Sequence, residues 1–260
     1  MKRAVRIAAA GLLAAAMLLF TAFAAPQTAA KSAILINGKT GEVLYAKNEN
    51  ARSLIASTTK IMTALLIAET CDPAARTTIR PEAVGIEGSS LYLKEGEVLT
   101  IGDLLYGLML QSGNDAAVAL AQYLDGDEAA FVLRMNRRAE ELGLADTRFG
   151  NPHGLDSSEN YSTAADLAKL TAFALENDLF RTVVSTKTHT FGERSLANHN
   201  KLLWRYDGAI GVKTGYTKAA GRILVSAAER DGTRLIAVTI NDGNDWADHA
   251  RMLDYGFEQS

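Results

Sequence analysis

The spacing of apolar and polar residues predicts β-strands near both ends of the chain. Residues 32–37 and 42–47 are short strand-like runs joined by a Gly-Lys-Thr-Gly turn, which favours a hairpin. Residues 222–230 and 233–240 flank an Asp-Gly dipeptide, which is typical of the tightest hairpin turns. Residues 209–214 form another run of this kind. The chain is therefore expected to begin and end with strands.

Helical periodicity fills the middle of the sequence. Residues 57–70 are apolar almost all round, which predicts a buried central helix. Thr100 and Asp103 resemble a capping box, and Asp115 is expected to cap the helix that follows. Further helices are predicted over residues 100–110, 116–124, 128–142, 163–176 and 246–257.

These elements predict an α+β fold in one domain. An antiparallel sheet from both chain ends, flanked by N- and C-terminal helices, would form one lobe over residues 30–59 and 205–260. A helical lobe over residues 60–204 would be inserted between the strands. Active sites commonly lie in the cleft between two such lobes.

The N-terminus indicates export. Lys2, Arg3 and Arg6 precede an uncharged Ala- and Leu-rich run, which ends at the small-x-small sequence Ala22-Phe23-Ala24. This arrangement is typical of a secretory signal peptide over residues 1–24. An uncleaved membrane anchor is the alternative, because the run is nearly long enough to span a bilayer.

Composition excludes several classes of function. The net charge is −3, so nothing indicates nucleic-acid binding. The single cysteine, Cys71, cannot form an intramolecular disulfide and is interpreted as a small buried hydrophobe. The four histidines lack metal-ligand spacing, so neither a metal nor another cofactor is expected.

Three short motifs carry candidate chemistry. The first is Ser57-Thr58-Thr59-Lys60, which places a hydroxyl and an amine three residues apart, on one face of a helix. A serine hydroxyl is a weak nucleophile until a base removes its proton, and lysine is such a base only when its pKa is lowered. The helix N-terminus, the apolar surroundings and the charge of Lys213 could lower it.

The other two motifs are polar segments far along the chain. Ser112-Gly113-Asn114 falls in the break between two predicted helices, where a hydroxyl and an amide could relay a proton and hold a peptide backbone. Lys213-Thr214-Gly215 follows a predicted strand, and glycine would let an extended peptide approach closely. The order and context of the three motifs are those of penicillin-binding proteins and β-lactamases.

Over residues 31–257 the sequence resembles the D-alanyl-D-alanine carboxypeptidases, which are low-molecular-weight penicillin-binding proteins of serine peptidase family S11. The resemblance implies a β-lactamase/transpeptidase-like fold with a five-stranded antiparallel sheet. The stretches that carry it are residues 56–63, 104–107, 112–117, 135–136, 142–144, 151–155, 162–164, 198–203 and 211–217.

The resemblance also implies a reaction. Ser57 would attack the carbonyl between two D-alanines at the end of a peptidoglycan stem peptide, and Lys60 would act as the base. Ser112 would pass the proton to the leaving amine. The backbone N–H groups of Ser57 and Tyr216 would form the oxyanion hole. β-Lactam antibiotics would acylate Ser57 as mimics of the dipeptide.

Substrate binding is assigned by the same resemblance. Asn114 would bind the substrate backbone, while Lys213 and Thr214, followed by Gly215, would hold the terminal carboxylate. Many relatives place a carboxylate-binding arginine where this chain has residues 241–249, which contain none. Lys213 or Arg222 could substitute, although Arg222 is expected at the surface. Because the sequence stops at Ser260, neither a second β-rich domain nor a stable membrane anchor is expected.

Three other functions stay open. A serine β-lactamase shares the motifs but needs a group that activates the deacylating water, and Glu159 is the only candidate, interpreted as a loop residue. A D,D-endopeptidase would use the same machinery on cross-links. A catalytically silent sensor of peptidoglycan or β-lactams is disfavoured, because no motif residue is lost.

Overall fold

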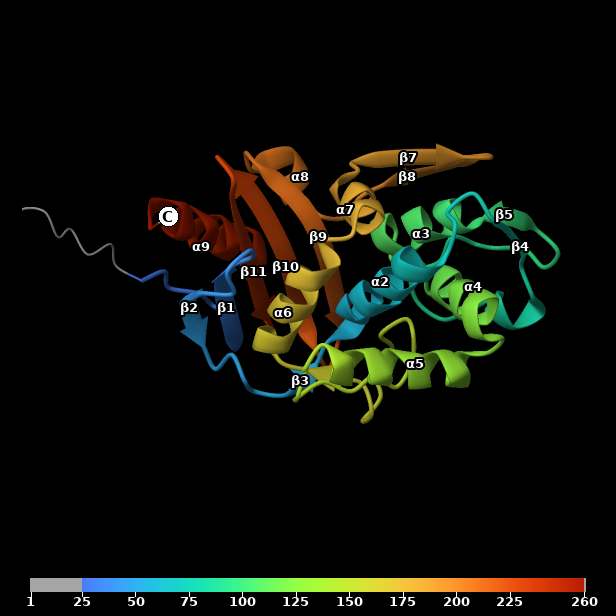
Figure 1. Cartoon of the computed structure of the whole chain (residues 1–260), viewed down its shortest axis with the longest axis horizontal. Coiled ribbons are helices and arrows are strands. Elements are labelled where there is room, and N and C mark those ends of the chain that lie inside the picture. Colours follow the sequence, from blue (N-terminus) through green and yellow to red (C-terminus); the bar gives the residue numbers. More distant parts are fainter. Residues whose placement is uncertain (1–24, 260) are drawn as a thin grey trace, which may run out of the picture.

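The fold is α+β, as predicted. The computed structural model describes residues 25–259, so the predicted signal peptide lies outside the described residues. A five-stranded antiparallel sheet has the strand order β2-β1-β11-β10-β9 (Figure 1). Its strands are β1 (Ser32–Asn37), β2 (Val43–Lys47), β9 (Ala209–Thr217), β10 (Gly221–Arg230) and β11 (Thr233–Ile240).

The strand pairing confirms that both chain ends build one sheet. β1 and β2 form the N-terminal hairpin, and β10 and β11 form the hairpin around the Asp-Gly turn. β1 then pairs with β11, with Ile34 opposite Val238. β9 pairs with β10 and is left at one edge of the sheet.

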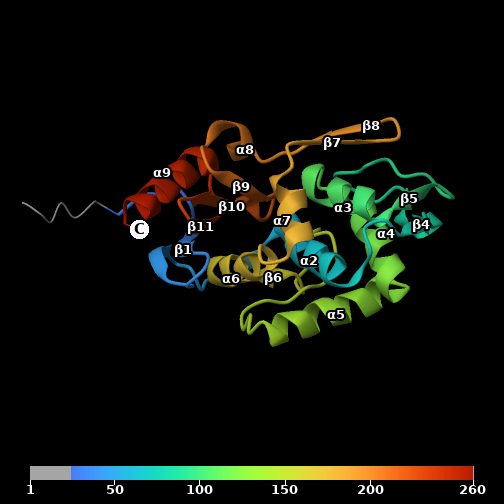
Figure 2. The same cartoon turned by 45° about the horizontal axis from the view of Figure 1, so that its top comes forward.

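Helices cover both faces of the sheet. Strand side chains alternate between the faces, so Leu35 packs with Leu253 of α9 (Asp245–Glu258), while Ile34 and Ile36 join the larger core on the opposite face. That face also contacts α6 (Ala164–Ala174), and the strands lie between α6 and α9 (Figure 2). The helix predicted to flank the sheet at the N-terminal end does not occur between residues 25 and 31, which enter β1 without a helix.

The helical lobe surrounds α2 (Lys60–Thr70), whose first eight residues are all buried, as predicted for the central helix. Around it pack α3 (Ile101–Leu110), α4 (Asn114–Asp125), α5 (Glu128–Glu141) and α7 (Asp178–Ser185). The shorter elements are β3 (Ser53–Leu54), η2 (Ala56–Thr59), β4 (Arg76–Thr78), η3 (Pro81–Ala83), β5 (Val98–Thr100), β6 (Tyr161–Ser162), β7 (Thr188–Phe191), β8 (Arg194–Ala197) and α8 (Leu202–Arg205).

Two predicted helix starts differ from the structure. The predicted helix over residues 57–70 opens as the separate 3₁₀ turn η2 and becomes α-helical only at Lys60. Asp115 does not cap α4, because the helix begins at Asn114, two residues before the predicted start, with Gly113 at its N-cap. The Asp115 carboxylate instead accepts hydrogen bonds from N–H groups of a distant loop, which is a tertiary contact that local capping rules do not predict.

Among residues 25–259, none of the helices has the length and hydropathy of a membrane span.

Candidate active site

The nucleophile candidate lies at a strained turn. Ser57 is in η2, directly after Ala56, whose φ of 44° is uncommon for a residue with a side chain. Lys60 is the first residue of α2, and its Nζ lies 3.0 Å from Ser57 Oγ. The predicted meeting of hydroxyl and amine therefore occurs, across the junction of a 3₁₀ turn and an α-helix.

The Lys60 amine is held by two acceptors besides the serine. Its Nζ donates to Asn114 Oδ1 at 2.7 Å and to the carbonyl oxygen of His153 at 2.5 Å. A neutral amine has two N–H bonds, and these acceptors use both of them. The remaining lone pair then faces the Ser57 hydroxyl, which is the orientation that a general base needs.

The electrostatics favour the neutral amine. Burial lowers the pKa of Lys60 well below its ordinary value, and the nearby charge of Lys213 lowers it further. These are two of the causes that the sequence predicted. Asp115 acts in the opposite direction and raises the Lys60 pKa. Burial also lowers the pKa of Lys213, to about 7.

The Ser112-Gly113-Asn114 turn joins α3 to α4 beside Lys60. Ser112 has a φ of 62°, a second strained backbone position in the site. Asn114 is buried, and both ends of its amide are engaged. Its Oδ1 accepts from Lys60, and its Nδ2 donates to the carbonyl oxygen of Glu87 at 2.6 Å. Its predicted contact with the substrate backbone stays a prediction.

The third motif runs along the edge strand β9. A Cβ atom on Gly215 would lie 3.3 Å from the backbone nitrogen of Ser57, which is a tight contact, so glycine favours the close packing of β9 on η2. Lys213 is buried, and its Nζ donates to the carbonyl oxygen of Thr214 at 2.9 Å. An edge strand leaves backbone groups free to pair with an extended peptide.

The three motifs meet at one pocket of about 640 Å³ between the sheet and the helical lobe, where the cleft was predicted. Lys60, Asn114 and Lys213 lie buried behind its wall. The residues that line it are Ser57, Ser89, Ser112, His199, Lys201, Thr214, Gly215, Tyr216, Arg222, Ile223, Asp245 and Trp246.

A model of the D-alanyl-D-alanine carboxypeptidase family, peptidase family S11, matches residues 20–244. The chain belongs to this family. It is 39% identical over 243 residues to the D-alanyl-D-alanine carboxypeptidase DacF of Bacillus subtilis. That match covers 88% of the chain but 62% of DacF, so the chain spans less than two thirds of that relative.

Solved structures of family members have the same fold. The crystal structure of the Streptomyces K15 DD-transpeptidase superposes with a TM-score of 0.86 and 36% identity, over 90% of this chain and 99% of that one. The D-alanyl-D-alanine carboxypeptidase of Mycobacterium tuberculosis H37Rv gives a TM-score of 0.87 and 32% identity, over 92% and 94%.

In this carboxypeptidase family member Arg222 is exposed, as expected, and its side chain also lines the pocket. The buried carboxylate of Asp245, the first residue of α9, holds it through Nε at 3.0 Å and Nη2 at 2.8 Å. Arg222 pairs with Tyr216 across β10 and β9, so both side chains project to the pocket side of the sheet.

Several groups in and around the pocket were not predicted. The His153 carbonyl acts on Lys60 through its backbone, which no side-chain motif could reveal. Lys201 and Trp246 come from separate segments and meet at the pocket wall, with the Lys201 Nζ 5.9 Å from the Trp246 ring centroid. Their positions depend on the packing of α9 and the segment before α8 rather than on any spacing in the sequence.

Glu159 does not reach the pocket. Its carboxylate is exposed and pairs with Arg148 at 2.5 Å, as a loop residue would. It therefore gives the β-lactamase alternative no activating group for water. Cys71, interpreted as a small buried hydrophobe, is only half-buried, at the C-terminal end of α2, and burial raises the pKa of its thiol.

Proposed function

We propose that the protein is a serine-type D-alanyl-D-alanine carboxypeptidase that removes the terminal D-alanine of peptidoglycan stem peptides. The observation that carries this proposal is the buried Lys60 amine, 3.0 Å from Ser57 Oγ, with both of its N–H bonds engaged elsewhere. Membership of the carboxypeptidase family supports the choice of substrate.

The reaction would proceed through an acyl-enzyme. Lys60 Nζ takes the hydroxyl proton while Ser57 Oγ bonds to the carbonyl carbon between the two D-alanines. The backbone N–H groups of Ser57 and Tyr216 stabilise the oxyanion. The proton then passes from Lys60 through Ser112 to the leaving nitrogen, and D-alanine departs. Water attacks the ester by the same path and regenerates the serine.

Cations around the pocket would select a substrate with a free carboxyl end. Lys213 and Thr214 are placed by β9, with Gly215 leaving room for the peptide backbone. Arg222 opens onto the same pocket, and its ion pair with Asp245 fixes one edge of the guanidinium. The other edge can donate to a carboxylate in the planar geometry that arginine prefers. We assign Arg222 a share in binding the substrate carboxylate.

The acyl-enzyme could also transfer its peptide to an amine. The Streptomyces K15 structure, which carries the name DD-transpeptidase, covers 90% of this chain at 36% identity. This likeness favours transpeptidation or D,D-endopeptidase action on cross-links as the second candidate function. β-Lactams would acylate Ser57 in either case.

The compartment belongs to the same proposal. The basic residues and apolar run at the N-terminus support export as a signal peptide over residues 1–24, leaving a single catalytic domain from residue 25. Peptidoglycan lies outside the cytoplasmic membrane, so the enzyme would act there, in the wall or free of the cell.

D-alanine release from a pentapeptide, compared with cleavage of a cross-linked dimer, tests the proposal. The wild-type protein should release D-alanine and be labelled by fluorescent penicillin, whereas Ser57→Ala should lose both activities. Ser53→Ala, outside the pocket, is the matched control. Activity retained by Ser57→Ala would contradict the mechanism, and rapid turnover of a chromogenic β-lactam would indicate a lactamase instead.

A further inference from the structure

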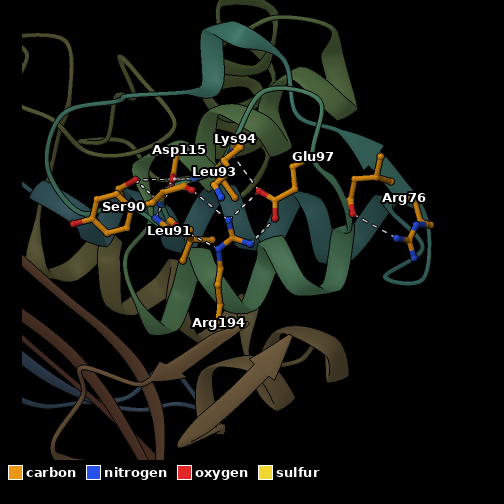
Figure 3. A network of polar contacts seen from close by, with 10 residues as sticks. Arg76, Ser90, Leu91, Leu93, Lys94, Glu97, Asp115 and Arg194 are labelled. Atoms are coloured by element: carbon orange, nitrogen blue, oxygen red, sulfur yellow. Dashed lines mark hydrogen bonds and ion pairs between the residues drawn. The ribbon is translucent and has the colours of Figure 1, made fainter. Parts of the chain in front are cut away.

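A buried carboxylate that the reaction does not use lies next to the Ser112-Gly113-Asn114 turn. Asp115, the second residue of α4, is fully buried. Its carboxylate accepts hydrogen bonds from Ser90 Oγ at 2.6 Å, from Leu91 N at 2.9 Å and from Leu93 N at 3.2 Å (Figure 3). One side chain therefore holds three groups of the loop between η3 and β5.

Asn114 holds the same loop from its other side. Its backbone N–H donates to the carbonyl oxygen of Ser89 at 2.7 Å, and its Nδ2 donates to that of Glu87. Gly113 is packed tightly here, because a Cβ atom would lie 2.9 Å from Asp115 Oδ1 and 3.0 Å from Leu91 Cγ. The loop and the turn therefore pack as one unit, and Ser89 of this unit lines the pocket.

Arg194 closes this unit from outside. It comes from β8 and donates through Nε to the carbonyl oxygen of Leu91 at 3.0 Å and through Nη2 to that of Tyr92 at 3.2 Å. Its Nη1 pairs with Glu97 at 2.5 Å (Figure 3). The loop is therefore held by two side chains. The Asp115 carboxylate binds its N–H groups, and the Arg194 guanidinium binds its carbonyl oxygens.

We propose that Asp115 is a positioning residue for the nucleophile, acting through the loop and Asn114 on the Lys60 amine. The inference rests on the proposed function. Asp115 fixes the loop, the loop carbonyls of Glu87 and Ser89 fix Asn114, and Asn114 Oδ1 orients Lys60 toward Ser57. A small displacement of a catalytic group from the reactive geometry can cost about 100-fold in rate.

The Asp115 charge adds an effect that packing alone would not produce. It raises the Lys60 pKa, which the charge of Lys213 on β9 lowers. On the remaining side of Lys60 lies His153, whose pKa is lowered to about 4 by burial first and, when the Lys60 amine is protonated, by its charge. Asp115 itself interacts with Arg194, whose other charged neighbours are Glu97 and Glu193.

Asp115→Asn tests the proposal. The amide keeps the shape but removes the charge and gives a poorer acceptor for the loop. The second-order rate of acylation by fluorescent penicillin should fall roughly 10- to 100-fold. The acid limb of the pH profile of this acylation rate should move to lower pH, because the variant lacks the carboxylate that raises the Lys60 pKa. Asp125→Asn, at the opposite end of α4 and paired with Arg134, is the matched control.

Two milder variants keep the test decisive if Asp115→Asn does not fold. Ser90→Ala and Arg194→Gln each loosen the loop but retain the Asp115 carboxylate, so both should slow acylation several-fold without moving the acid limb to lower pH. Folded variants that are acylated at the wild-type rate would overturn the proposal. Wild-type protein that penicillin does not label would instead overturn the proposed function itself.

Discussion

Asn114→Asp would place a carboxylate against the amine that the mechanism requires to be neutral. Asn114 Oδ1 accepts from Lys60 Nζ at 2.7 Å, and both side chains are buried. The substitution changes the amide into an acid of the same size, so the geometry can persist while the charge changes. The variant therefore separates the electrostatics of the pair from its packing.

The magnitude follows from that distance. Two unit charges 2.7 Å apart interact by about 6 kcal/mol at an effective dielectric constant of about 20. This corresponds to about four pKa units at 1.36 kcal/mol each. The cost of burying the new carboxylate offsets part of it, so we expect the Lys60 pKa to rise by at least about two units. The repulsion between the carboxylate and the Glu87 carbonyl should also cost about 1–3 kcal/mol of stability.

The sign of the pH effect is determined by which form of Lys60 is active. The rate falls as the pH drops through the Lys60 pKa, because protonation removes the base. Raising that pKa moves the acid limb to higher pH. At a pH below both the original and the new Lys60 pKa, each unit of increase reduces the neutral fraction tenfold, so a rise of about two units should reduce the rate about 100-fold there and by less at higher pH.

The assay is D-alanine release from an acylated Lys-D-Ala-D-Ala peptide between pH 5 and 10, with penicillin acylation measured in parallel. Asn136→Asp on α5 is the control, because Asn136 is part-buried and binds the backbone of Phe149 but lies outside the pocket. It should lower stability without moving the acid limb. A folded Asn114→Asp protein with the wild-type limb would show that Lys60 is not the titrating base.

Two further substitutions test other parts of the site. Arg222→Gln should raise the KM about tenfold or more for a peptide with a free carboxyl end and leave the KM for a C-terminally amidated peptide unchanged. Initial rates on both peptides measure this. An equal rise in KM for both peptides would contradict carboxylate binding by Arg222. Gly154→Ala should slow penicillin acylation and lower unfolding stability by more than about 2 kcal/mol, because its φ is 91° and its Cβ would lie 2.0 Å from the Ala56 carbonyl oxygen. Gly192→Ala is the denaturant-unfolding control, since it has positive φ but no atom within 4 Å of its Cβ.

The sequence alone determined the elements and the chemistry of three motifs. Alternation with a period of two, together with an Asp-Gly turn, specifies the hairpin of β10 and β11 and the face that each residue presents. An apolar surface all round α2 specifies a helix in the core. Spacing of three residues specifies that Ser57 and Lys60 meet. All three are local properties, because each depends only on residues that are close together in the sequence.

Only the tertiary structure decided what surrounds the reacting groups. Asp115 was expected to cap its own helix, yet its carboxylate binds a loop more than twenty residues away. Arg222 is exposed, as expected, but only the tertiary structure shows that Asp245 of α9 holds its side chain at the pocket. The carbonyl of His153 meets the Lys60 amine through the close passage of Gly154 against Ala56. These contacts join backbone and side-chain groups from distant segments, and local periodicity contains no information about which distant polar group a packed core will bring to a given side chain.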